Sequence, residues 1–193
     1  MTTKRHTKQD LLEAASHLFE QKGYKGTSIR DIAKATDTSI SNIYHHFGNK
    51  EGLWKTIHET SVMDLPDKLR NALAAETDPL LRFKSLLKTH LEVASEYRRE
   101  SRIFFLHYDP IDPTRNRINI ELQNSILDIY VDELTSLKRQ GVIKTRHIKI
   151  MALNILGVLN WVLRWFRLDG KLRPQKVHEE IINFILGGMG VSQ

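Results

Sequence analysis

The sequence predicts an all-α protein of about nine helices. Apolar residues recur at helical spacing along almost all of the 193 residues, and no alternation typical of a β-strand runs for more than a few residues. Glycine and proline, which interrupt helices, number only 10 and 5. Hydrophobic residues (40%) and charged residues (27%) stand at the level of soluble globular proteins, and the length allows one or two domains.

Four helices are expected in the first part of the chain. Gly23 stops the first one, since glycine accepts the left-handed conformation that often ends a helix. A short second helix begins near Ser28, which together with Asp31 fits a capping box. A third short helix starts at Ser39, and the fourth is expected to run without interruption over 49–76.

Five more helices are expected in the rest of the chain. Proline opens three of them, at residues 79, 113 and 174, because its missing N–H has no partner in a first helical turn. The other two cover about 98–108 and 145–168.

The net charge of +6 permits a nucleic-acid partner without pointing to one. Residues 1–60 hold nine Lys and Arg against seven Asp and Glu, a net +2, so the other +4 lies beyond residue 60. Because the basic excess is not concentrated in one segment, nucleic-acid binding has to be argued from pattern.

Cellular location is inferred from three absences. Cysteine is missing, which excludes disulfides and thiolate metal sites. The start, MTTKRHTKQD, lacks the apolar segment of a secretory signal. The most apolar run, 150–166, is shorter than the ~20 residues of a membrane span and contains Asn154, Asn160 and Arg164. We therefore expect a cytoplasmic protein with a buried helix here and no membrane contact.

Residues 27–47, TSIRDIAKATDTSISNIYHHF, carry the most informative pattern. Two helices of about two turns each are joined by a very short turn, which is the arrangement of a helix-turn-helix whose second helix enters the major groove. That helix exposes small polar side chains, while Ile43 and Phe47, four residues apart, anchor it to the core. On spacing alone, two packed helices of any all-α protein fit as well.

The stretch 18–54, LFEQKGYKGTSIRDIAKATDTSISNIYHHFGNKEGLW, resembles the N-terminal region of TetR-family repressors. The remaining three quarters of the chain resemble that family only in helical layout and length. The resemblance implies a helix-turn-helix DNA-binding domain over 1–48 and a ligand-binding and dimerisation domain over 49–193. It also implies a ligand-responsive regulator, usually a repressor, that binds a palindromic operator in double-stranded DNA as a homodimer.

The resemblance implies phosphate contacts by Thr27, Tyr44 and Lys50. Two positions depart from the family's pattern. Asp37 stands in the turn where glycine is usual, and Asp tolerates left-handed backbone better than most residues. Ile40 stands where a basic or polar residue is common. It either contacts a thymine methyl or packs back on the DNA-binding domain. The other residues expected to face DNA are Ser28, Ser39, Ser41, Asn42 and His45.

The family's last two helices pair with a second subunit, and the sequence supports a dimer independently. The helix over 148–166 is apolar nearly all round, and the last helix adds another apolar face. The alternative is a central helix surrounded by its own domain. The residues expected at the dimer interface are Leu159, Val162, Phe166, Val177, Ile181, Phe184 and Ile185.

Polar and aromatic residues inside otherwise apolar helices are candidates for an effector pocket. For each one singly, a core or surface role is the simpler interpretation. The segment 157–166 resembles a branch of the family that is tied to fatty-acid or sterol catabolism and senses acyl-CoA, which implies an apolar effector and places Arg164 or Arg167 at the CoA phosphates. The pocket candidates are His90, Tyr97, Phe104, Phe105, His107, Tyr108, Asn160, Trp161, Arg164 and Trp165.

Catalysis is not expected, and neither is a metal or a cofactor. The sequence has no Ser-His-Asp order, no glycine-rich phosphate loop and no paired-carboxylate signature. His45 and His46 are adjacent and so point to different faces of a helix. Two alternatives remain: a helical small-molecule binding or adaptor protein without DNA binding, and a nonspecific architectural DNA binder, which would need basic clusters and minor-groove wedges that the sequence lacks.

Overall fold

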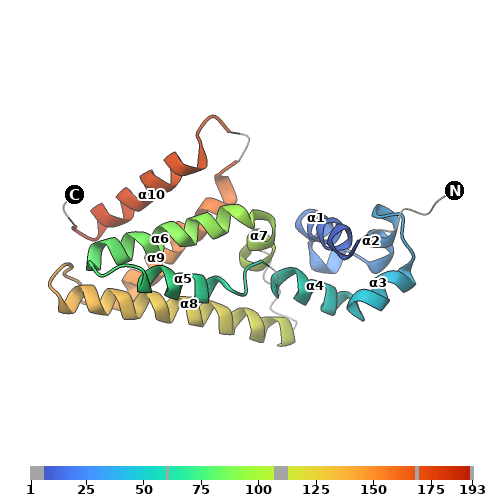
Figure 1. Cartoon of the computed structure of the whole chain (residues 1–193), viewed down its shortest axis with the longest axis horizontal. Helices are drawn as coiled ribbons and strands as arrows, with labels where there is room; N and C mark the ends of the chain where they lie inside the picture. Colours follow the sequence, from blue (N-terminus) through green and yellow to red (C-terminus); the bar gives the residue numbers. More distant parts are fainter. Residues whose placement is uncertain (1–6, 60, 107–112, 168–169, 192–193) are drawn as a thin grey trace. The chain divides into compact units, whose positions relative to one another are not determined.

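The computed structural model describes residues 7–59, 61–106, 113–167 and 170–191, with side chains at all of these except 104–106, 113–116 and 118. Every regular element in these ranges is a helix, so the all-α prediction is confirmed (Figure 1). The ten helices are α1 (Lys8–Gly26), α2 (Ile29–Ala35), α3 (Ile40–Phe47), α4 (Lys50–Glu59), α5 (Leu65–Ala74), α6 (Pro79–Glu96), α7 (Arg98–Leu106), α8 (Pro113–Arg139), α9 (Ile148–Trp165) and α10 (Pro174–Gly188).

The helix expected over 49–76 is in fact two helices, which raises the number from about nine to ten. α4 ends at Glu59, and α5 begins at Leu65 with Asp64 as its N-cap. Pro66, in the first turn of α5, explains the interruption, because proline has no N–H to donate and disfavours a helical conformation in the residue before it. The expectation of one continuous helix overlooked this proline.

The chain forms two compact units, defined by residue range. Unit 1 comprises residues 1–63 and 99–109, which contain α1 to α4 and α7. Unit 2 comprises residues 64–98 and 110–193, which contain α5, α6, α8, α9 and α10. Unit 1 therefore takes in α4 and α7 in addition to residues 1–48.

Unit 1 is built around α1, which packs against α2 and α4, while α3 packs against α2 and α4. Fully buried side chains from all four helices form its core: Leu11, Phe19, Ile32, Ile43 and Leu53. α7 is joined to α1 by Glu20, whose carboxylate oxygens lie 3.5 Å from Nε of Arg99 and 3.3 Å from Nε of Arg102.

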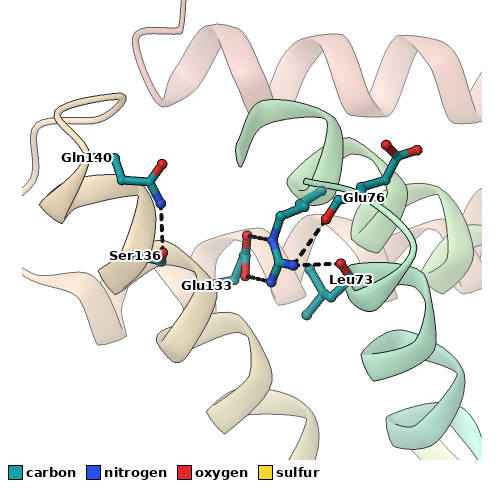
Figure 2. Close-up of polar contacts among 6 residues, drawn as sticks. Leu73, Glu76, Glu133, Ser136 and Gln140 are labelled. Atoms are coloured by element: carbon teal, nitrogen blue, oxygen red, sulfur yellow. Dashed lines mark hydrogen bonds and ion pairs between the residues drawn. The ribbon is translucent and has the colours of Figure 1, made fainter. Parts of the chain in front are cut away.

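Unit 2 is centred on α6, which contacts α5, α8, α9 and α10 (Figure 1). At the start of α6, Arg82 makes a two-pronged ion pair with the buried Glu133 of α8, at 3.2 Å from Nε and 3.0 Å from Nη2. Nη1 of the same guanidinium donates to the carbonyl of Leu73 (2.7 Å), in the last turn of α5. It also donates to the carbonyl of Glu76 (3.3 Å), just beyond the end of that helix. Figure 2 shows these acceptors converging from two separate segments, so one arginine ties α5, α6 and α8 together.

Candidate nucleic-acid interface

Only four residues separate α2 from α3, and their backbone forms a closed turn. The N–H of Thr38 donates to the carbonyl of Ala33 (3.0 Å), and that of Asp37 donates to Lys34 (3.5 Å). This pair of bonds is the Schellman motif, which places one residue in the left-handed conformation. Asp37 is that residue, with φ of 48°, so the expected left-handed turn is formed without glycine.

α3 is fixed at its start by a cap and along its inner face by two apolar side chains. Ser39 is the N-cap, and its hydroxyl accepts a hydrogen bond from the N–H of Asn42 (3.1 Å). Ile43 and Phe47 are both buried in unit 1, as their four-residue spacing predicts. Gly48, with φ of 73°, ends the helix. The cap, the two buried side chains and the terminating glycine thus fix where α3 begins and ends and which face it turns to the core.

The opposite face of α3 is open to solvent and mostly polar. Ser41 and His45 are exposed there, and Tyr44 is 47% exposed. Ile40, for which the sequence left two orientations open, is 38% exposed and points outward. Asn42 is half-buried, and its Nδ2 donates to the hydroxyl of Thr38 (3.0 Å). Since an amide nitrogen carries two hydrogens, Asn42 retains one donor and its acceptor oxygen for another partner.

Ser28 and Thr27 both hold the junction between α1 and α2. The Ser28 hydroxyl donates to Asp31 Oδ2 (2.6 Å). This hydrogen bond and a second one from the Ser28 backbone N–H lower the pKa of the Asp31 carboxyl. The two residues form the expected capping box. Thr27 is only 1% exposed, and its hydroxyl donates to the carbonyls of Gly23 (2.9 Å) and Leu18 (3.1 Å). A phosphate contact by the Thr27 side chain, as the resemblance implied, does not fit this buried position.

Lys50 opens α4 directly after the end of α3. Its Nζ lies 4.1 Å from the centroid of the Tyr24 ring. The preceding residue, Asn49, accepts the N–H of Gly52 through its side-chain oxygen (2.7 Å) and so caps the helix. Tyr44 and Lys50 thus place a hydroxyl and an ammonium group in the same unit as the polar face of α3.

Two family descriptions match this chain, one at each end. Residues 11–57 match the bacterial regulatory proteins of the tetR family, and residues 76–189 match the tetracyclin repressor-like C-terminal domain. The chain belongs to the TetR family. The resemblance drawn from residues 18–54 is confirmed, and this TetR-family chain is a DNA-binding transcription regulator with a helix-turn-helix in unit 1.

Individual relatives of this TetR-family chain are similar over almost the whole length. The transcriptional repressor KstR2 of Rhodococcus jostii is 24% identical over 182 residues, which cover 93% of this chain and 89% of the relative. The structure of KstR2 of Mycobacterium tuberculosis, a ketosteroid transcriptional regulator, has a TM-score of 0.87 at 22% identity and covers 99% of this chain and 98% of that one. The structure of AibR in complex with isovaleryl coenzyme A and operator DNA has a TM-score of 0.77 at 24% identity and covers 91% and 96%.

Of the expected pocket residues whose side chains the structure describes, His90 and Asn160 are brought together, while the others lie elsewhere. His90 is buried in unit 2, where its Nδ1 lies 3.0 Å from the Tyr130 hydroxyl and Asn160 forms a second hydrogen bond to the ring. Burial lowers the pKa of His90 to about 4, so this imidazole is neutral near pH 7. Tyr130 is an addition to the expected set, and its position four residues after Ile126 and four before Leu134 is the signal that places it in the core.

The other pocket candidates lie elsewhere. Tyr97 is the C-cap of α6, with Nζ of Lys68 5.0 Å from its ring centroid. Trp161, Arg164 and Trp165 are exposed on the outer face of α9, which corrects their assignment to an enclosed pocket. Phe104 and Phe105 belong to α7, but their side chains are outside the described set, as are residues His107 and Tyr108 entirely.

The expected dimer-interface residues need a larger correction. Six of them are buried inside unit 2 itself, because their side of α9 and α10 faces the unit's own core: Leu159, Val162, Phe166, Val177, Ile181 and Ile185. Phe184 alone of the expected set is exposed, at 69%. The outer face of α9 carries a different group of apolar side chains, Ile150, Leu153, Trp161 and Trp165.

This outer face also contains a hollow of about 320 Å³ between α9 and α10. Buried Ile155, Ile185 and Met189 line it together with the exposed Ile150 and Phe184. α9 is also long and apolar enough to cross a lipid bilayer, and 33% of the helix is buried inside the structure. Among the expected pocket residues whose side chains are described, none lines this hollow.

Proposed function

We propose that this chain is a ligand-responsive repressor that acts in the cytoplasm, binds a palindromic operator as a homodimer and is released by a small apolar effector. The observation that carries the proposal is the division of α3 into a buried apolar face and an exposed polar face. Exposed Ser39, Ile40, Ser41 and His45, together with the half-buried Asn42, are short enough for a helix in the major groove to bring them against base edges.

The proposed contacts divide into two kinds. Tyr44 and Lys50 bind phosphates, which sets the register of the protein on the duplex and adds salt-dependent affinity. Asn42 and its neighbours on α3 read bases, with the free donor and acceptor of the Asn42 amide suited to adenine. Ile40, exposed among polar residues, suits the methyl group of thymine.

The homodimer is supported by the uncovered surface of unit 2. Trp161 and Phe184 are 61% and 69% exposed, and such a cluster of large apolar side chains marks a contact surface. We propose that α9 and α10 of a second copy cover it in a four-helix arrangement. Gly157 lies on the same exposed face between Leu153 and Trp161, and a Cβ at this residue would meet nothing within 4 Å, so two α9 helices have room to cross closely there.

The hollow beside that crossing point fits the same arrangement. If two antiparallel α9 helices cross near Gly157, Trp161 of one copy lies opposite Leu153 and Asn154 of the other. Because Asn154 lines the hollow, the exposed indole of Trp161 would pack into the hollow of the second copy. The twofold relation repeats this contact once, which makes the surface self-complementary.

The effector is proposed to be an acyl-CoA or a related apolar compound that carries a carbonyl group. The structure of AibR with isovaleryl coenzyme A and operator DNA supports this class, as does the similarity to a ketosteroid regulator. Within unit 2, neutral His90 with Tyr130 and Asn160 supplies buried hydrogen-bonding groups without charge, which suits a carbonyl group better than an ion.

Footprinting on the promoter region beside the chain's own gene, at physiological salt, tests DNA binding. We expect protection of a palindrome whose half-sites are one helical turn apart, about 34–36 Å, or a multiple of that distance. Lys50→Ala should weaken binding to all sequences and reduce the salt slope by about one. Absence of protection over the whole region would favour an adaptor protein without DNA binding.

Release is tested by titrating ligands into a preformed operator complex. Isovaleryl-CoA, long-chain acyl-CoA, free fatty acids and sterol-derived acids are compared with CoA alone as the control. A true effector lowers operator affinity about 5- to 150-fold, the usual range of coupling between two sites. A ligand that binds without changing operator affinity would contradict release, and binding by none of them would remove only the acyl class.

A further inference from the structure

The hollow between α9 and α10 combines buried apolar side chains with exposed polar ones. Ile155 and Ile185 belong to the first group, and His147 and Asn154 belong to the second. Within the described ranges, neither of these polar side chains forms a hydrogen bond to another residue. At about 320 Å³ the hollow lies at the lower end of the ~300–1,000 Å³ of small-molecule sites. A small ligand with an apolar body and a polar end matches such a lining.

The charges on the α9 side of the hollow are of one sign. Residues 134–168 contain seven Lys and Arg and no Asp or Glu. Lys144, Arg146 and Lys149 are all exposed, and the two lining residues that precede α9 lie between them in the sequence. None of these three cations forms an ion pair with any residue that the structure describes. This side of the hollow therefore has an uncompensated positive charge.

The α10 side of the hollow does not supply the missing negative charge. Residues 181–193 contain no charged side chain. Glu180 comes one helical turn before Phe184 of the lining, but its carboxylate lies 3.0 Å from Nζ of Lys176. Glu179 lies 3.6 Å from the same nitrogen. A ligand with a negatively charged end would therefore meet attraction and little repulsion here, and a carboxylate suits both Lys and Arg.

We propose that this hollow is a second ligand site, which binds a small carboxylic acid with an apolar chain. The chain lies against the buried apolar side chains, and the carboxylate lies towards Thr145 and His147, beside the cations. The site is separate from the effector groups proposed around His90, which does not line the hollow. Because Trp161 of a second copy is proposed to pack into the same hollow, the acid competes with that contact and weakens the dimer. The competition rests on the proposed homodimer, whereas the ligand site itself does not.

The first test titrates the full chain with octanoate, and octan-1-ol serves as a probe with the same chain and no charge. We expect octanoate to bind, and octan-1-ol to bind about two- to five-fold more weakly, because an interaction with exposed charges contributes only modestly. Equal affinity for the two probes would overturn the assignment of a carboxylate. Absence of octanoate binding in both the parent and Trp161→Ala, in which the competing side chain is gone, would overturn the site.

Gly188 offers a way to fill the hollow without disturbing the fold. It lines the hollow, and a Cβ at this residue would meet nothing within 4 Å. Gly187→Leu is the matched control, because its Cβ also meets nothing within 4 Å and Gly187 does not line the hollow. Gly188→Leu should abolish octanoate binding, and Gly187→Leu should retain it. Retained binding in Gly188→Leu would overturn the proposal.

Two further variants test the cations and the location. Arg146→Gln should weaken octanoate binding about two- to five-fold, whereas Lys171→Gln, an exposed cation before α10, should not. An equal effect of the two would show that only net charge matters and would overturn the role of the cations. If His90→Gln abolishes binding and Gly188→Leu does not, octanoate occupies the effector site. That result would overturn the second site while supporting the proposed function.

Sedimentation measures the competition with the second copy. Octanoate should shift the parent towards the monomer, and Trp161→Ala should bind octanoate more tightly than the dimeric parent does. A parent dimer that binds octanoate in the hollow without any shift would overturn the competition. A parent that is monomeric, and whose octanoate binding is abolished by Gly188→Leu, would contradict the proposed homodimer and still support the ligand site.

Discussion

Nδ1 of His90 lies 3.0 Å from the hydroxyl oxygen of Tyr130, and both side chains are enclosed in the core of unit 2. The two residues come from α6 and α8, and Asn160 of α9 supplies a further hydrogen bond to the imidazole. Burial favours the neutral form of each ring, lowering the pKa of His90 to about 4 and raising that of Tyr130. Three helices are thus joined by a polar cluster without charge.

This cluster predicts a pH-dependent stability. Unfolded His90 binds a proton near its ordinary pKa of 6.5, whereas folded His90 stays neutral down to about pH 4. The free energy of unfolding should therefore fall as the pH falls from about 6.5 to about 4 and change no further below that, a total of about 3 kcal/mol from this residue. Urea denaturation at a series of pH values measures it.

The control is His90→Gln, which retains hydrogen bonding but does not titrate. Its pH dependence over the same window should be shallower than the parent's. His178, whose pKa is also lowered by burial, titrates in both proteins and therefore cancels in the comparison. Identical slopes for parent and variant would show that His90 is not held neutral.

Arg82→Met should destabilise the chain by about 2–4 kcal/mol. The variant leaves the buried Glu133 carboxylate without its partner and removes the donor from the carbonyls of Leu73 and Glu76. The matched control is Arg70→Met, whose ion pair with Asp67 is exposed and should contribute less than about 1 kcal/mol. Equal losses of thermal stability in the two variants would contradict a special role for Arg82.

Gly52→Ala should be destabilising although alanine is the better helix former. A Cβ at residue 52 would lie 2.1 Å from the carbonyl oxygen of Phe47, at the end of α3. This is a backbone atom that cannot rotate away, so the clash, about 1–3 kcal/mol, outweighs the gain of about 1 kcal/mol in helix propensity. Gly26→Ala, whose Cβ would meet only Lys22 Cβ at an ordinary 3.5 Å, is the control in a thermal melt.

Trp161→Glu or Phe184→Glu should convert the proposed dimer to a folded monomer. Both side chains are exposed in one copy, so neither change disturbs the core of unit 2. Leu81→Glu, an exposed residue of α6, should leave the dimer intact. Sedimentation at micromolar concentration measures the outcome, and a monomeric parent would contradict the dimer. Charges at the buried Ile181 and Ile185 should instead unfold unit 2.

Thr38→Val should relax base preference in the same direction as Asn42→Ala. The Thr38 hydroxyl fixes the Asn42 amide at 3.0 Å, and an amide without this bond rotates more freely. Asn42→Ala should lose about 1–3 kcal/mol of discrimination at one base of each half-site, and Thr38→Val a fraction of that. Thr38→Ser keeps the hydroxyl and should retain specificity. Selection from random duplexes reads out all three, and an unchanged preference in Asn42→Ala would remove Asn42 from base reading.

The helix-turn-helix could be predicted from the sequence because its signals are local. The Ser28–Asp31 box, the turn at Asp37 and the pair Ile43 and Phe47 each act over three or four residues. The break before α5 was equally local, through Pro66, but helical periodicity on both sides concealed it. The domain boundary at residue 48 stays a prediction.

The helices of unit 2 could be predicted, but the direction of their faces could not. α9 is apolar on almost every side, so no polar stripe shows which face enters the core. Val162 and Trp161 are adjacent and both apolar, yet only packing against α6 and α8 decides that the first is buried and the second exposed. The ion pair of Arg82 with Glu133, 51 residues away, leaves no pattern in the sequence at all.

The left-handed Asp37 places a negative charge in the turn that precedes α3. Its conformation costs the folded chain about 1–2 kcal/mol relative to glycine whether or not DNA is bound, whereas its exposed carboxylate would repel the phosphates of a bound operator. Replacement by glycine should stabilise the fold by removing the backbone cost, and the loss of the charge should lengthen the residence time on the proposed operator. A regulator that responds by leaving its operator gains from a short residence time, because transcription then follows the effector concentration closely. The turn is thus a place where the speed of the response can be tuned without altering any residue proposed to read the operator.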